Sequence, residues 1–156
     1  MRKQWFSGCL LALSGLVMAE NVPEHLIQIG KSDNPTYYNL QSIKLNDSNP
    51  KVVQFDIIIN VEDDEELRGT SMVGTHYVYC QDKIILDDAE GILKVYDQPF
   101  GQGKLALTIP ITPKRVELND DISLKSITAA NACTQMKLSY GGNSVTLSDI
   151  RRWLSE

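Results

Sequence analysis

The residues of this sequence best suited to chemistry are its three cysteines and two histidines. One of them closes the segment THYVYCQD, which alternates like a β-strand and reaches its cysteine at Cys80. Cys80 could be a nucleophile, a metal ligand or half of a disulfide. His76 lies four residues earlier, which in a strand places the two side chains on one face but about 13 Å apart. That separation is too long for a Cys–His nucleophile, whose two side chains must reach each other.

The first 19 residues have the organisation of a secretory signal peptide. Arg2 and Lys3 precede an apolar stretch that begins at Cys9, and Ala19 is a small residue at the predicted cleavage position before Glu20. The stretch is shorter than the roughly 20 apolar residues of a membrane-spanning helix. Lipid attachment at Cys9 is the alternative. Lipoprotein signals, however, place the apolar stretch before the cysteine, whereas here most of it follows.

Removal of the signal peptide leaves two cysteines, Cys80 and Cys133. Two cysteines in an oxidising compartment have one possible pairing, so we predict a disulfide between them. Closing the loop between Cys80 and Cys133 stabilises the fold by about 4 kcal/mol in the chain-entropy model. A nucleophile paired with His25 and a zinc site completed by carboxylates are the remaining alternatives. Zinc normally takes more Cys or His ligands than the exported chain provides.

The exported chain is acidic. The sequence has 15 basic and 20 acidic residues, and loss of Arg2 and Lys3 leaves 13 basic residues and a formal charge of −7. The length remaining after cleavage predicts one domain with a substantial core. The acidity argues against nucleic acid, whose phosphates need a basic face, and against electrostatic docking on anionic lipid.

Six segments have the composition and alternation of β-strands, and turn-forming links join them. They read HLIQIG, TYYNLQSIKL, KVVQFDIII, SMVGTHYVYC, KIILDD and GILKVYD. Short links favour antiparallel pairing, so the segments predict a meander. The pattern then changes, because Ser123 can cap a helix that carries Cys133 in its last turns. The predicted fold class is α+β: an antiparallel sheet of about six strands with a C-terminal helix packed on one face and tied to it by the disulfide.

Two further segments were weighed as ligand sites. The loop NVEDDEELRG has five successive acidic residues, 62–66, but lacks the ligand spacing of a calcium loop. The segment FGQG, 100–103, is not followed by a predicted helix, so it is no phosphate cradle, and its glycines predict a bulge or tight turn. The sequence therefore predicts no metal and no cofactor.

The order of strands and cysteines carries a family resemblance between Leu26 and Cys133. It rests on the segments LIQIG, TYYNLQSI, PKVVQFDIIIN, YVYC, KVYDQPFGQG and ITAANAC. Together these are similar to the surface-adhesin protein E family of Gram-negative bacteria. The resemblance implies a curved antiparallel sheet with a helix held on it by the disulfide. It also implies a non-enzymatic envelope protein, since named members are surface adhesins for host proteins.

Two sets of side chains are candidates for binding a partner protein. Tyr77 and Tyr79 share the strand face opposite His76 and Cys80, so they point outward if the disulfide faces the helix. Outward tyrosines suit a partner-binding surface, but tyrosine is also common on half-buried sheets.

The second set lies in a C-terminal extension, residues 138–156, which the resemblance does not cover. A short amphipathic helix is predicted from Ser148, with Trp153 on its apolar face and Arg151 and Arg152 beside it. One interpretation is a lid on the domain's own sheet. The other is a docking element with Trp153 as its anchor and the arginines as a basic patch.

The sequence thus predicts a signal peptide at 1–19, an adhesin E-like domain at 20–137 and the extension at 138–156. The predicted function is that of an exported, non-catalytic, adhesin-like module that binds another protein, either a host surface or matrix protein or an envelope component. It would act in the periplasm or on the outer-membrane surface of a Gram-negative bacterium, without nucleic acid and without a membrane span. The alternative is a soluble periplasmic assembly or maintenance factor with the same fold. Open sheet edges also make a homodimer possible.

Overall fold

The computed structural model describes residues 21–30, 32–118 and 123–156. The predicted signal peptide lies outside the described residues, as do Cys9 and the cleavage junction between Ala19 and Glu20.

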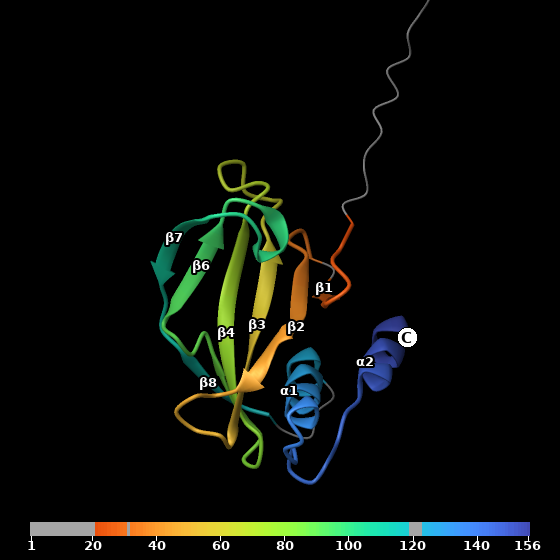
Figure 1. The fold of residues 1–156 in the computed structure, drawn as a ribbon. Helices are drawn as coiled ribbons and strands as arrows, with labels where there is room; N and C mark the ends of the chain where they lie inside the picture. Colours follow the sequence, from red (N-terminus) through yellow and green to blue (C-terminus); the bar gives the residue numbers. More distant parts are fainter. Residues whose placement is uncertain (1–20, 31, 119–122) are drawn as a thin grey trace, which may run out of the picture.

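The described chain forms an antiparallel sheet followed by two helices, which is an α+β fold (Figure 1). The sheet has eight strands: β1 (Leu26–Gly30), β2 (Thr36–Leu45), β3 (Val52–Asn60), β4 (Ser71–Tyr79), β5 (Ile84–Asp87), β6 (Ile92–Tyr96), β7 (Leu105–Pro110) and β8 (Lys114–Glu117). A short 3-10 helix η1 (Pro99–Gly101) lies between β6 and β7, and the α-helices are α1 (Leu124–Gln135) and α2 (Leu147–Ser155). Neither α-helix in the described part of the chain is long and apolar enough to cross a membrane.

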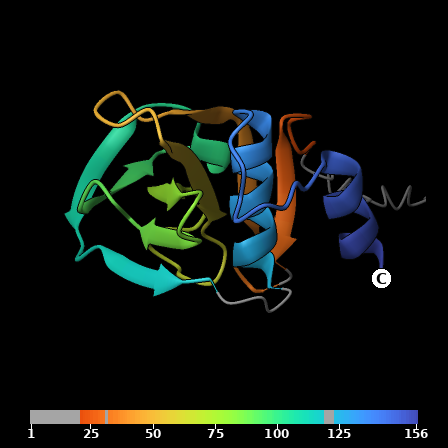
Figure 2. The ribbon, with the colours of Figure 1, turned by 90° about the horizontal axis from the view of Figure 1, so that it is seen from below.

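The first five strands pair in chain order, as in a meander. On the side away from β3, β4 has two neighbours: β5 pairs with Tyr77–Tyr79 and β6 pairs with Ser71–Val73. Strand β8 then extends β5, and β7 extends β6. The predicted antiparallel sheet is confirmed. The predicted meander order is wrong at one step, because β6 pairs with β4 and not with β5, and β7 and β8 were not predicted. Figure 2 shows the resulting curved sheet, with β1 and β7 on opposite sides.

The main core lies between the sheet and the helices. On β3, Val53 and Phe55 alternate inward as predicted and join Tyr38 of β2 and Val78 of β4 in one buried cluster. The rings of Tyr38 and Phe55 meet edge to face at 5.2 Å. The buried face of α1 contributes small side chains to this cluster, Ala129, Ala130, Ala132 and Cys133, which allow the helix backbone to approach the strands closely.

A disulfide joins Cys80 to Cys133, as predicted, with their Cα atoms 5.9 Å apart. It connects the residue after β4 to the last turn of α1. The cap predicted for this helix is also present, since the Ser123 side chain accepts a hydrogen bond from the Ser126 backbone N–H. Helix α1 is thus fixed at its start by its own cap and near its end by a covalent bond.

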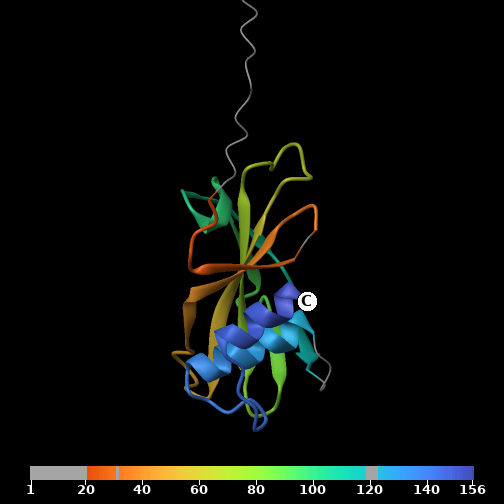
Figure 3. The same ribbon diagram turned by 90° about the vertical axis from the view of Figure 1, so that its right-hand side faces the viewer.

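The C-terminal extension shares the main core. Ile150 of α2 is fully buried in the same cluster as Phe55 and Cys133, and α1 contacts α2. Figure 3 shows the two helices crossing the same end of the molecule. The N-cap of α2 is Thr146, two residues before the predicted start at Ser148.

A smaller cluster occupies the opposite side of the sheet. Tyr37, Ile58, Val73 and Leu26 pack there against Phe100 of η1. The FGQG segment forms the tight turn that its glycines predict, and the backbone N–H of Phe100 donates to the Asn60 side chain at 2.8 Å. This turn closes the end of the sheet far from the helices.

Candidate functional site

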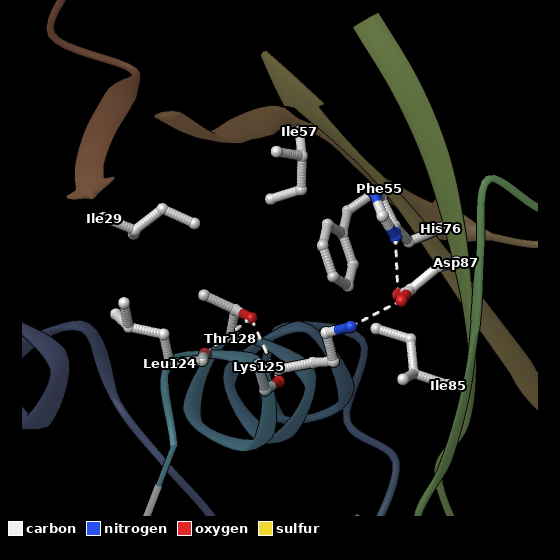
Figure 4. A pocket seen from close by; sticks show the side chains of 9 residues that line it. All are labelled: Ile29, Phe55, Ile57, His76, Ile85, Asp87, Leu124, Lys125 and Thr128. Carbon is white, nitrogen blue, oxygen red and sulfur yellow. Dashed lines mark hydrogen bonds and ion pairs between the residues drawn. The ribbon is translucent and has the colours of Figure 1, made fainter. Parts of the chain in front are cut away.

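A cavity of about 200 Å³ lies between the sheet and the first turns of α1 (Figure 4). Most of its wall is apolar. The lining residues come from β1, β3, β4, β5 and α1: Ile29, Phe55, Ile57, His76, Ile85, Asp87, Leu124, Lys125 and Thr128. Figure 4 shows the charged side chains at one side of the cavity and Ile29 with Leu124 at the other. The cavity therefore has an apolar body and one polar wall.

The polar wall is a chain of three charged or ionisable side chains from three elements. His76 Nδ1 lies 3.1 Å from Asp87 Oδ1, and the Lys125 ammonium donates to Asp87 Oδ2. The side chains of His76 and Asp87 are each only 13% exposed. These three side chains connect β4 and β5 to the first turn of α1.

Burial alone would raise the pKa of Asp87. The hydrogen bonds from His76 and Lys125 outweigh that effect and hold the pKa below its ordinary value. An ionised Asp87 can accept a hydrogen bond from Nδ1–H of His76. The same ring stacks on Phe55 with centroids 5.6 Å apart.

Lys125 occupies a position that its own helix disfavours. It stands in the first turn of α1, where the helix dipole repels a positive charge. Asp87 offsets this repulsion by direct contact. The ion pair therefore acts as a second fastening of α1 to the sheet, at the opposite end of the helix from the disulfide.

The described residues that line the cavity offer one hydroxyl and no thiol. The Thr128 hydroxyl donates to the carbonyls of Leu124 and Lys125 within its own helix, and both described cysteines are in the disulfide. Within the described ranges no three His, Cys, Asp or Glu side chains are grouped to hold a metal ion. The site therefore consists of an ion pair that holds α1 and an apolar cavity. The cavity is comparable in size with engineered cavities of about 150 Å³ that bind benzene.

The first pair of predicted site residues lies on β4. Tyr77 and Tyr79 are half-buried, and strand alternation puts them on the face opposite His76 and Val78. Tyr77 stands across from Gln54 of β3. Their side chains are therefore not part of the cavity wall.

The second set lies on α2. Arg151 and Arg152 are exposed, and Arg152 pairs with Asp149 at 3.1 Å. Trp153 is half-buried and forms a wall of two grooves, of about 390 and 370 Å³. One groove is shared with Ile127, Val145, Asp149, Arg152 and Glu156, and the other with Gln28, Ile29, Gly30, Leu124 and Leu154. The structure thus places the two predicted sets on separate elements, β4 and α2.

Sequence reasoning missed both the charged chain and the exposed strand β7. Asp87 and Lys125 are separated by 38 residues, and no local pattern relates them. For β7 a signal existed, because Leu105, Leu107 and Ile109 alternate with smaller or polar residues. Pro110 and Pro113 obscured it by suggesting a loop.

No known protein-family profile and no curated protein sequence matches the chain. Solved structures of Haemophilus influenzae protein E do match it. One, in crystal form II, is 20% identical with a TM-score of 0.54 and covers 75% of this chain and 93% of its own. A second is 20% identical with a TM-score of 0.54 and covers 79% and 91%. A third, from a non-typeable strain, is 19% identical with a TM-score of 0.53 and covers 87% and 91%. The predicted resemblance to protein E is confirmed at the level of the fold.

Proposed function

We propose, from the premise of a shared protein E fold, that this chain is an exported, non-catalytic module that binds another protein at the cell envelope. The observation that carries the proposal is that sequence and structure both resemble protein E. The order of strands and cysteines in the sequence resembles the surface-adhesin protein E family, and the structure matches protein E over most of both chains. The name adhesin-like follows from that family.

The arrangement of the helix supports the same proposal. We infer that α1 covers one face of the sheet, as the resemblance implies. In support of this, α1 contacts β2, β3 and β4, and its buried side chains share a cluster with the inward side chains of those strands. A sheet covered on one side leaves the other side and the strand edges available to a partner.

A non-catalytic role is supported by the cavity. Its polar groups are engaged with one another, since Asp87 accepts from both His76 and Lys125. Covalent catalysis would need a nucleophile within reach of His76, and the one hydroxyl among the described lining residues, that of Thr128, donates to its own helix. The His76, Asp87 and Lys125 side chains instead hold α1 against the sheet.

The signal peptide at 1–19 and cleavage before Glu20 remain part of the proposal. Formation of the Cys80–Cys133 bond is consistent with an exported protein, because disulfides persist in oxidising compartments. Location at the periplasm or outer-membrane surface follows from that export and from the family resemblance.

A binding panel tests the proposal. The protein comprising residues 20–156 would be immobilised, and host matrix and serum proteins and an extract of bacterial envelope proteins would be passed over it. We expect saturable binding to at least one host protein, reduced by Trp153→Ala or by Tyr77→Ala if those side chains take part. Binding only to envelope proteins would favour the periplasmic assembly factor. No binding to either class would contradict a protein-binding function.

A further inference from the structure

The strand β7 is the most exposed apolar element of the described chain. All six of its residues are exposed, although Leu105, Leu107 and Ile109 are large and apolar. Their exposed fractions are 52%, 45% and 36%, and they make up three of the five exposed large apolar side chains in the described ranges. Apolar surface concentrated in one strand is typical of an interaction site.

One edge of β7 has no partner strand among the described residues, because β7 pairs only with β6. The ladder between them shows which backbone groups face outward. Ile111 N–H donates to the Gly91 carbonyl, so the pairs Leu93–Ile109 and Val95–Leu107 are the hydrogen-bonded ones. Thr108 lies between those pairs, and its N–H and C=O therefore point to the open edge.

Pro110 fits this assignment. It lies two residues after Thr108, so its backbone nitrogen also faces the open edge. Proline is accepted at such a position because it has no N–H to contribute to the ladder. It also limits the open edge at one end. A strand that added to β7 would therefore exchange two hydrogen bonds with Thr108 and stop near Pro110.

The side chains of β7 continue an apolar face of the sheet. The register places Leu107 beside Val95, Val95 beside Met72, and Met72 beside Ile59, which makes one row across four strands. The next row contains Ile57, Gly74, Leu93 and Ile109, with both Leu93 and the Asp88 carboxylate beside Gly74. An added strand with apolar side chains on this face would bury Leu107 and Ile109.

The charges beside β7 indicate the character of the added strand. Residues 105–113 carry no charge, and Lys104 precedes them while Lys114 and Arg115 follow. Arg115 is paired with Glu117, and the Asp97 carboxylate accepts from the Lys104 backbone N–H, so the positive charge at the two ends is that of the Lys104 and Lys114 side chains. Lys104 and Lys114 are exposed. In a chain with a formal charge of −5 this is an uncharged edge with basic ends, so it complements an apolar segment with acidic ends. Antiparallel pairing of two copies would instead bring basic ends together.

We propose that the open edge of β7 is a docking site for an extended segment of a partner protein, which adds to the sheet through Thr108 and matches the basic ends with acidic residues. This mode of recognition is β-strand addition. The inference rests on the proposed protein-binding function and names the surface that would perform it.

A synthetic peptide tests the docking edge directly. The probe has valine and threonine alternating over six positions with two glutamates at each end. We expect saturable binding, slower hydrogen exchange at the Thr108 amide and weaker binding in higher salt. A version with N-methylated backbone amides should not bind, and a version with lysines at both ends should bind about tenfold more weakly. Equal binding of the lysine version would overturn the charge assignment.

Substitution at the edge provides the matched comparison. Thr108→Pro removes the outward N–H without breaking the bonds to β6, and should weaken the peptide by about tenfold or more. Thr108→Val keeps the N–H and should bind like the original protein. Melting temperatures of both variants check that the fold is retained, and the exchange measurement on the unchanged protein needs no variant. Equal peptide binding by Thr108→Pro, or no protection of the Thr108 amide, would overturn the inference.

Two further outcomes separate this inference from the proposed function. If Thr108→Pro binds its host protein as well as the unchanged chain does, the edge is not the binding surface and the proposed function stands. If the panel yields no partner while the peptide still binds at Thr108, the proposed function fails and the edge assignment stands. Dimers detected by light scattering and abolished by Thr108→Pro would assign the edge to a second copy and overturn the acidic partner.

Discussion

The hydroxyl of Tyr38 donates a hydrogen bond to Asn131 Oδ1 at 3.0 Å, and both residues are completely buried. Asn131 in turn donates through Nδ2 to the carbonyl of Val145 at 3.0 Å. One amide side chain therefore joins β2, α1 and the C-terminal extension. Burial raises the pKa of the Tyr38 phenol, so the hydroxyl remains protonated and able to donate.

Replacement of Asn131 should destabilise the fold strongly. Asn131→Ala leaves the Tyr38 hydroxyl and the Val145 carbonyl without this partner and opens a small cavity, so we expect a loss of about 3 kcal/mol in the free energy of unfolding. Urea denaturation followed by circular dichroism measures it. The exposed Asn143→Ala serves as the control and should change stability by less than about 0.5 kcal/mol. Equal stability of both variants would show that the buried network contributes little.

Substitutions on the buried and the exposed face of α2 should affect stability and partner binding differently. Ile150 is fully buried, so Ile150→Ala should cost about 2 to 5 kcal/mol, and truncation after Gly142 should cost at least as much. Trp153→Ala changes a half-buried groove wall and should reduce partner binding with a smaller loss of stability if α2 is a docking element. Thermal melts and the binding panel measure the two effects. A truncated protein that keeps both its melting temperature and its partners would make the extension dispensable.

Loss of the disulfide should loosen α1. Cys133→Ser is expected to lower the free energy of unfolding by about 4 kcal/mol, because the unfolded chain regains the entropy of a loop with a sequence separation of 53. Cys80→Ser and the double variant should lose the same amount, since each removes one bond. Chemical denaturation measures the losses, and intact mass shows whether exported protein lacks two hydrogens. Two free thiols in the exported protein would refute the assignment.

Asp87 should make the fold sensitive to acid. Its pKa is lower in the folded than in the unfolded state, so its stabilisation is present above the unfolded value of about 3.9 and is lost as the pH falls through the folded value. Asp87→Asn should cost roughly 1 to 3 kcal/mol at neutral pH and much less near pH 2. Urea denaturation across this range measures the difference.

Asp56 provides a control, because its pKa shift is opposite in direction to that of Asp87. Burial raises its pKa, although a hydrogen bond from Thr75 lowers it in part. The folded state therefore loses stability as the pH rises from the unfolded to the folded value of Asp56, and Asp56→Asn should remove that loss. If the two variants showed the same pH dependence, the assignment of Asp87 as a favourable ion-pair partner would be wrong.

The sequence predicted those elements whose side chains repeat with a buried face. The alternation of Val53, Phe55 and Ile57 located β3, and Ser123 with the small residues after it located α1. Cysteine number determined the disulfide, because two cysteines allow one pairing. The strand alternation and the helix cap are local signals, and the two cysteines allow a single pairing, so the sequence alone is enough to predict these features.

What the sequence did not reveal depends on pairing over distance. Strands β5 and β6 both pair with β4, and Ala89 between them donates to the Thr75 carbonyl of β4, so the chain continues along β4 where the sequence predicted a hairpin. The His76–Asp87–Lys125 chain combines three elements whose relative positions follow from that topology. Strand β7 carries the alternation of Leu105, Leu107 and Ile109, but Pro110 and Pro113 suggested a loop instead.

Labelling of intact cells with a membrane-impermeant, lysine-reactive reagent tests whether the protein is exported and exposed at the cell surface. Lys104 and Lys114 are exposed in the structure and provide reactive positions beside β7. We expect the protein to be labelled on intact bacteria and its N-terminus to be Glu20. Protection of both lysines until the outer membrane is opened would contradict the adhesin-like role and support a periplasmic factor. Unlabelled protein that retains residues 1–19 in the cytoplasmic fraction would contradict export itself.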